Sequence, residues 1–285
     1  MPVSDQELAS LTSSHDIITI GMRADEVRGR LHGTTTTFVR VVDLGADGGD
    51  IAVPHGAGEI RIVGAPATRA AAAARVAEVL PQARGIPVSA YSLADLEALA
   101  ARENATLRSL LEELRAAGLE LVAEAPFDRL QDARRSIEEV NIAGLTLARL
   151  TIHQLSGEDG TQQFKRVAEL HRAVGVIRAF APLPRRTNPA VPTTGFDDVK
   201  RVAMARLVVE NVASIQVDWA LYGPKLAQVA LTVGADDVDS VSAEDDTGEG
   251  RRRAPLEEIR RNIRAAGHDP AERNGRFDPL DLVAR

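Results

Sequence analysis

Short runs rich in valine, isoleucine and leucine alternate with amphipathic stretches along nearly the whole chain, and this alternation restricts the fold more than any other feature. Strands that alternate with helices are typical of βα units around a parallel sheet. We expect strands near residues 34–44, 59–63, 86–91, 119–123, 146–152, 177–181 and 214–219, and a last short strand just before Gly234. This order predicts an α/β fold, a TIM-like (β/α) barrel that is complete or partial. A doubly wound open sheet is the alternative.

No linker is long enough to divide the 285 residues. We therefore predict a single barrel domain over residues 1–285. It is expected to begin with a short N-terminal helix and to end in a helical tail at about residues 255–285, after a polar loop at 242–254.

The charge pattern bears on the partners of the chain. The net charge is −7, and the one basic cluster, Arg251 to Arg253, stands among acidic residues. Because nucleic-acid binding needs a concentrated basic face, we expect no nucleic-acid partner. The segment Met1 to Ser14 is polar, and no apolar run reaches the roughly 18 residues that a membrane span needs. We expect no membrane association and a cytoplasmic location.

The sequence contains no cysteine. This excludes disulfides, thiolate nucleophiles, and zinc or iron–sulfur sites held by cysteine. No spacing of the other residues matches a known metal motif, so we predict no metal site and no [4Fe–4S] cluster.

Polar residues stand where the predicted strands end, and the site of a β/α barrel lies at the carboxyl ends of its strands. The residues at these positions are Asp43, Tyr91, Asp95, Glu124, His153, Arg185, Arg186, Asp218, Trp219, Asp236 and Asp237.

Roles follow from side-chain chemistry. We predict that Glu124, His153 and Asp237 are acid–base groups. Ligand contacts are predicted for Tyr91, Asp95, Arg185, Arg186, Asp218, Trp219 and Asp236, because arginine pairs bind carboxylates or phosphates and tryptophan stacks on flat groups. Structural explanations remain open for several of them. Trp219 is also a candidate core residue, and Asp236 and Asp237 also fit a turn or a helix cap.

Several segments resemble the radical SAM enzymes of the menaquinone pathway, aminofutalosine synthase and dehypoxanthine futalosine cyclase. The most specific are the run TTGFDDVK at 193–200, the run GPKLAQVAL at 223–231 and the run GADD at 234–237. Residues 24–40 are similar to the family's opening, and residues 265–273 to its C-terminal signature. The resemblance implies a radical SAM-type barrel. It also places Asp95 where the family has a glutamate, and His153 near a family histidine.

The chain departs from this family after the first strand. There the family has three cysteines, spaced C-x3-C-x2-C, whose [4Fe–4S] cluster chelates S-adenosylmethionine. Here Leu44 is followed by about 14 residues without cysteine before the second strand. This stretch predicts that the cluster loop and its helix are deleted, which leaves a shortened first βα unit. A glycine-rich family segment is also replaced, and Pro126 and Phe127 are predicted to narrow the pocket.

Two functions fit these observations. In the first, the chain is a cluster-less homologue without radical activity. It would bind a futalosine-type intermediate, or it would act as a scaffold or regulatory partner. Its own partner would be a cysteine-containing paralogue or a second copy of the same chain. In the second, it is a non-radical enzyme acting on a nucleoside or an aromatic carboxylate. No cofactor is expected, although S-adenosylmethionine could still bind through its adenosine part.

Overall fold

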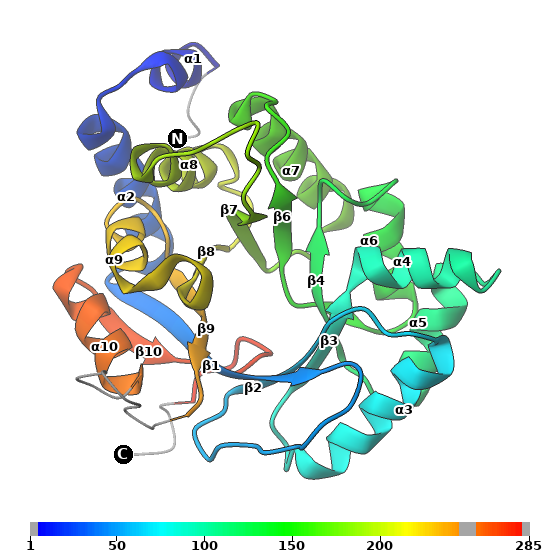
Figure 1. Ribbon diagram of the computed structural model, residues 1–285. Coiled ribbons are helices and arrows are strands. Elements are labelled where there is room, and N and C mark those ends of the chain that lie inside the picture. Colours follow the sequence, from blue (N-terminus) through cyan, green and yellow to red (C-terminus); the bar gives the residue numbers. More distant parts are fainter. Residues whose placement is uncertain (1–4, 245–254, 281–285) are drawn as a thin grey trace.

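Eight parallel strands close into a barrel with helices around it (Figure 1). The computed structural model describes residues 5–244 and 255–280. Strand β1 pairs with β2 on one side and with β9 on the other, which closes the sheet. This confirms the predicted barrel and excludes the open sheet. The barrel strands are β1 (Thr35–Gly45), β2 (Glu59–Val63), β3 (Val88–Ser92), β4 (Leu121–Pro126), β6 (Leu150–Gln154), β7 (Ala179–Arg186), β8 (Ser214–Asp218) and β9 (Asp237–Ser242).

The helices cover the outer face of the barrel and bury the apolar core between themselves and the strands (Figure 1). Side chains alternate along each strand, so Ile60 and Ile62 of β2 face the helices while Glu59 and Arg61 face the interior. The helices are α1 (Asp5–Ser13), α2 (Ile17–His32), α3 (Arg69–Val79), η1 (Leu80–Gln82, a 3₁₀ turn), α4 (Leu93–Arg102), α5 (Leu107–Ala116), α6 (Ala133–Ile142), α7 (Gly160–Val174), α8 (Gly195–Val208), α9 (Trp219–Leu231) and α10 (Pro255–Ala265).

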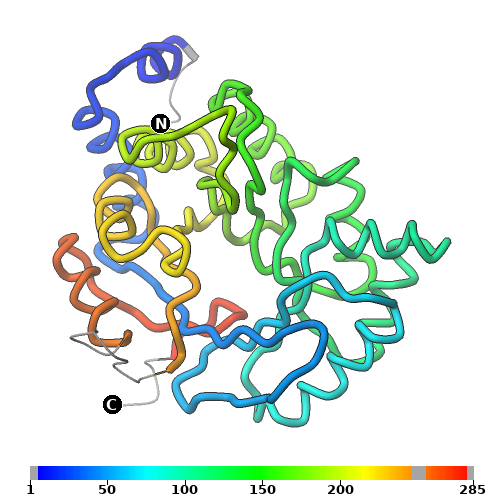
Figure 2. The backbone as a smooth tube through the Cα atoms, in the orientation of Figure 1, coloured from blue at the N-terminus to red at the C-terminus, as the bar shows by residue number. Residues whose placement is uncertain are grey.

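The connection from β1 to β2 lacks the helix that a parallel crossover usually has. Residues 46–58 run back to β2 as turns and irregular chain (Figure 2). Ile51 and Val53 of this loop pack against the core. Arg75 of α3 fixes the start of this connection by donating to the carbonyl oxygen of Gly45, the last residue of β1, at 3.0 Å. The predicted shortening of the first βα unit is confirmed, and the loop that replaces the helix packs Ile51 and Val53 against the core.

The last strands differ from the prediction. Helix α9 ends at Leu231, so the residues just before Gly234 form no strand, and β9 begins only after Gly234. The expected strand at 146–152 is two strands, β5 (Thr146–Leu147) and β6, and both pair with β4.

The C-terminal part is not only helical. After α10, strand β10 (Asp269–Glu272) pairs with residues Thr35 to Phe38 of β1, at the amino end of the barrel. The predicted loop at 242–254, with its arginine cluster, lies mostly outside the described residues, as do residues 281–285.

Candidate functional site at the mouth of the barrel

A cavity of about 540 Å³ opens at the carboxyl ends of the strands. Beside Asp43, the structure brings together there seven of the ten residues for which a catalytic or ligand-binding role was predicted. They are Tyr91, Asp95, Glu124, His153, Arg185, Arg186 and Asp218, which come from β3, α4, β4, β6, β7 and β8.

Arg185 connects two carboxylates at the centre of the mouth. Its Nε lies 3.2 Å from Oε2 of Glu124, and its Nη1 donates to Asp218 Oδ2. Burial opposes its charge, but Glu124 and Asp218 raise the pKa of Arg185. Asp218 also caps α9, because its Oδ1 accepts from the backbone N–H of Leu221 at 2.9 Å. Arg185 is therefore fixed in place by both partners.

A buried ionic network lies below the cavity. Glu59 Oε1 accepts from Arg61 at 3.0 Å, from Arg149 at 3.0 Å and from the hydroxyl of Ser89 at 2.6 Å. Asp239 accepts from Arg61 at 2.9 Å and also from Arg149. Burial opposes the ionisation of both carboxyl groups, but the two arginines lower the pKa of Glu59 and of Asp239 below their ordinary values. Ion pairs thus fill the barrel interior under the site.

Ser240 joins this network to the mouth. Its backbone is left-handed (φ 58°), and the register between β1 and β9 shifts beside it. This bulge turns both Ser240 and Asp239 inward, although neighbouring strand residues normally alternate. The Ser240 hydroxyl accepts from Arg61 at 3.0 Å and donates to Asp218 at 3.1 Å.

Three ionisable groups of the cavity are free for a ligand. Within the described residues, the side chains of Asp43, His153 and Arg186 form no hydrogen bond or ion pair. The Asp43 carboxyl group is exposed to the cavity, but protein atoms surround it on the other sides, and this partial burial raises its pKa. Asp43 on β1 and His153 on β6 lie on strands four steps apart in the eight-stranded order, so they face each other across the mouth.

Tyr91 contributes mainly its backbone to the cavity. Its φ is 60°, which is unusual for an aromatic residue. Its hydroxyl donates to the carbonyl oxygen of Ala72 in α3 at 2.9 Å, and burial raises the pKa of Tyr91 to about 12. The side chain points toward α3, so the predicted ligand contact of Tyr91 would involve its backbone.

Asp236 and Asp237 were wrongly placed at the mouth. Both lie at the amino end of β9, because that strand starts after Gly234 and not before it. Asp237 is fully buried and accepts from Arg273 at 2.6 and 2.7 Å. Asp236 accepts from Arg206 and from the backbone N–H of Ile215. They tie the amino end of the barrel together, so an acid–base role for Asp237 and a ligand contact by Asp236 are not supported.

Trp219 and the Pro126–Phe127 pair also lie elsewhere than predicted. Trp219 is the first residue of α9 and packs against the core, and it does not line the cavity. Phe127 lies outside the mouth, with the guanidinium of Arg166 5.4 Å from its ring centroid. Neither Pro126 nor Phe127 lines the cavity, so they do not narrow it.

The site does not fit the iron–sulfur cluster of the radical SAM fold. Such a cluster needs three thiolate ligands, and the sequence has no cysteine. In the part of the chain that the structure describes, no three His, Asp or Glu side chains are grouped so that they could hold a metal ion. No helix there is long and apolar enough to cross a membrane.

Comparisons with known proteins agree with this fold. Methylornithine synthase has a similar structure, with a TM-score of 0.68, 13% identity and 95% of each chain covered. The hydrogenase maturase HydG from Carboxydothermus hydrogenoformans gives a TM-score of 0.64 and 12% identity, over 95% of this chain and 76% of that one. The chain therefore shares the (β/α)-barrel fold of these two proteins.

The sequence comparisons are more specific. Residues 183–285 match the CofH/MqnC C-terminal region. Cyclic dehypoxanthine futalosine synthase of Streptomyces coelicolor is 27% identical over 60% of this chain and 47% of its own length. Aminodeoxyfutalosine synthase of Thermus thermophilus is 27% identical over 68% of this chain and 60% of its own length. The chain thus spans about half to two thirds of these relatives. Residues 183–285 thus carry the CofH/MqnC C-terminal region, in a chain that is similar to futalosine-pathway proteins over 60–68% of its length and contains no cysteine.

Sequence reasoning missed the ionic network. Glu59 and Arg61 interrupt an otherwise apolar strand with a spacing of two, and Arg149 and Asp239 also stand beside apolar residues. Charged residues on one face of a predicted barrel strand must point inward and need partners there. The spacing of two between Glu59 and Arg61 was therefore the feature of the sequence that indicated a buried ionic network.

Proposed function

We propose that this chain does not carry out the radical chemistry of its family and acts as a binding protein, a scaffold or regulatory partner of the futalosine pathway. One observation carries the proposal. The connection from β1 to β2, where the family holds its cluster, has neither cysteine nor helix, while the rest of the barrel is complete.

The mouth cavity supports the binding part of this proposal. Asp43, His153 and Arg186 offer an acceptor and potential donors without partners of their own, around a space large enough for a small molecule. Arg185 is held in place by two carboxylates, so the centre of the cavity is preorganised. A futalosine-type intermediate, with its carboxylate and hydroxyl groups, matches this set of charges.

The test is a calorimetric titration with aminodeoxyfutalosine and, separately, with S-adenosylmethionine. We expect saturable binding of aminodeoxyfutalosine that weakens about tenfold or more in Arg186→Ala, since a charged hydrogen bond is lost. Glu169→Ala, an exposed change on α7, is the control. Crosslinking with a cysteine-containing relative tests the scaffold role. A protein that binds neither the compound nor the relative contradicts the proposal.

A non-radical enzyme is the second candidate. It is favoured by the position of Asp43 and His153 on opposite sides of an open cavity, with Glu124 between them in strand order. In this case His153 and Asp43 exchange a proton with a bound nucleoside or aromatic carboxylate. Incubation with such compounds, followed by chromatography, should then reveal turnover that His153→Ala abolishes. Binding without any product rules this candidate out.

A further inference from the structure

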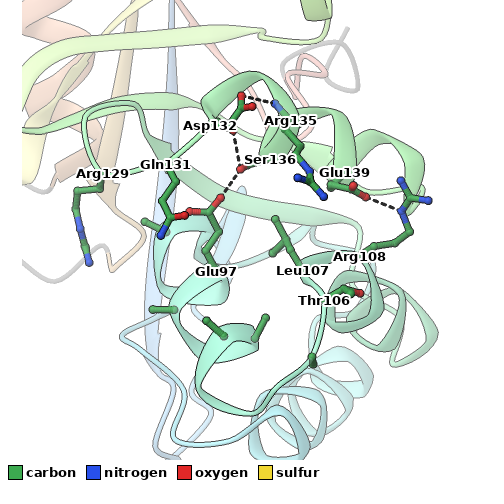
Figure 3. A pocket seen from close by; sticks show the side chains of 15 residues that line it. Glu97, Thr106, Leu107, Arg108, Arg129, Gln131, Asp132, Arg135, Ser136 and Glu139 are labelled. Atoms are coloured by element: carbon green, nitrogen blue, oxygen red, sulfur yellow. Dashed lines mark hydrogen bonds and ion pairs between the residues drawn. The ribbon is translucent and has the colours of Figure 1, made fainter.

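A second hollow lies on the outer side of the barrel, between α4, the start of α5 and α6 (Figure 3). Its volume is about 750 Å³. Small apolar side chains from α4 and the following turn line it, and so does the first residue of α5. They are Ala94, Ala98, Ala101, Ala105 and Leu107. We call this hollow the outer groove.

Polar pairs border the outer groove and satisfy one another. Arg108 donates to Glu139 at 2.5 Å, and the Ser136 hydroxyl donates to Glu97 (Figure 3). These pairs fix α5 and α4 against α6. The alanine surface between them is accessible, since Ala98 and Ala101 are exposed.

The outer groove and the mouth cavity meet at Arg129. Arg129 lines both hollows, and its Nη1 lies 3.3 Å from Oδ1 of Asp95, which lines the mouth cavity. The two side chains are 40% and 24% exposed. An ion pair this exposed contributes little to stability, whereas the Arg185–Asp218 and Arg149–Asp239 pairs are far less exposed. We call the Arg129–Asp95 pair the partition, and it is held less firmly than these two pairs.

The backbone beside Arg129 is held in place by hydrogen bonds that do not involve the Arg129 side chain. The carboxylate of Asp128 accepts from the backbone N–H groups of His153 and Gln154, at 2.6 and 2.9 Å. These bonds fasten the loop after β4 to β6. A rotation of the Arg129 side chain away from Asp95 would leave these bonds intact.

We propose that the mouth cavity and the outer groove form one extended site for an elongated amphipathic carboxylate. Its carboxylate takes the place of Asp95 on Arg129, near Arg186 at the rim, and its apolar chain lies on the alanines of α4. The ligand is inferred to be negatively charged because Arg129 is a cation that loses its partner when the partition opens. Its chain is inferred to be apolar because alanines line the outer groove. This inference rests on the proposed binding function of the mouth cavity.

The experiment is a calorimetric titration with straight-chain carboxylates from butanoate to decanoate, each below its micelle concentration. Each added methylene that is buried in the groove should strengthen binding about fourfold, the equivalent of about 0.8 kcal/mol. Ala98→Trp, which fills the groove, should remove this dependence on chain length. Ala74→Trp, the same change at an exposed position of α3, should retain it. Arg129→Gln should weaken all the carboxylates about tenfold.

The outcomes separate the two proposals. If aminodeoxyfutalosine binds but affinity does not rise with chain length, or rises equally in Ala98→Trp, the extended site is wrong and the mouth site stands. If the long carboxylates bind with the expected dependence but aminodeoxyfutalosine does not, the proposed pathway ligand is wrong.

Discussion

Arg149 and Asp239 form an ion pair inside the barrel, where their side chains are 3% and 1% exposed. Each has a second partner, because Arg149 also donates to Glu59 and Asp239 also accepts from Arg61. Four charges thus neutralise one another away from water. The removal of one of them leaves its partners buried and unpaired, which costs more than the loss of a surface pair.

Arg149→Met should therefore destabilise the protein by about 3–5 kcal/mol. The change keeps much of the side-chain volume but leaves Glu59 with one arginine partner. Denaturant unfolding followed by circular dichroism measures it. Arg134→Met, which breaks the exposed Arg134–Glu138 pair on α6, is the control and should leave the midpoint nearly unchanged. Equal midpoints for the two variants would refute the stabilising role of the network.

The network also predicts a dependence on pH. The pKa of Asp239 is lower in the folded protein than its ordinary value of 3.8, since Arg149 and Arg61 outweigh the cost of burial. Its contribution to stability is therefore complete above pH 3.8 and is lost as the pH falls toward the folded value. Asp239→Asn should lose several kcal/mol at pH 7, on the order of the 3–5 kcal/mol of a broken buried pair. The difference from the wild type should shrink below pH 4, and urea unfolding at pH 7, 5 and 3 checks this. A difference that does not change with pH would count against the assignment.

Asp237 should affect stability and not ligand binding. It is paired with Arg273 at the amino end of the barrel, far from the mouth along β9. Asp237→Asn should lower the free energy of unfolding by about 3 kcal/mol, because it leaves Arg273 buried without its carboxylate. The dissociation constant of any mouth ligand, measured by calorimetry well below the melting temperature, should stay within twofold of the wild-type value. A large loss of affinity in the folded variant would restore Asp237 to the site.

Phe127, which follows β4 at the carboxyl end of the barrel, allows a matching test. Its ring lies beside Arg166 and outside the mouth cavity. Phe127→Ala should therefore leave mouth binding unchanged, whereas a change at Arg186 should weaken it. If Phe127→Ala instead strengthens binding of large ligands, the ring narrows the cavity after all.

The sequence predicted the barrel because its signals are local. Strand β2 occupies the predicted range 59–63, and the short stretch before it already excluded a helix. Strand β10 was missed, because four residues that include Pro270 carry no strand pattern and pair only through the distant β1. Its formation depends on tertiary contact, which a local pattern does not contain.

The sequence predicted only part of the site, because local patterns locate the ends of clear strands but not contacts between distant strands. Residues just after clear strands, such as Glu124 and Arg185, reached the mouth because strand ends meet there. Asp236 and Asp237 do not lie at the mouth. The residues after α9 were predicted to be the last strand, which placed both aspartates at its carboxyl end, whereas they lie at the amino end of β9. The partners of Arg149 and Asp239 come from strands far apart in the chain, so only the closed barrel reveals them.

Anaerobic reconstitution with iron and sulfide tests the central claim most directly. The protein is then incubated with S-adenosylmethionine and a reductant, beside a cysteine-containing relative. We predict a colourless protein and no 5′-deoxyadenosine, while the relative turns brown and forms it, because no thiolate is present to hold the iron. A stable absorbance of a [4Fe–4S] centre in this chain, together with 5′-deoxyadenosine, would contradict the account.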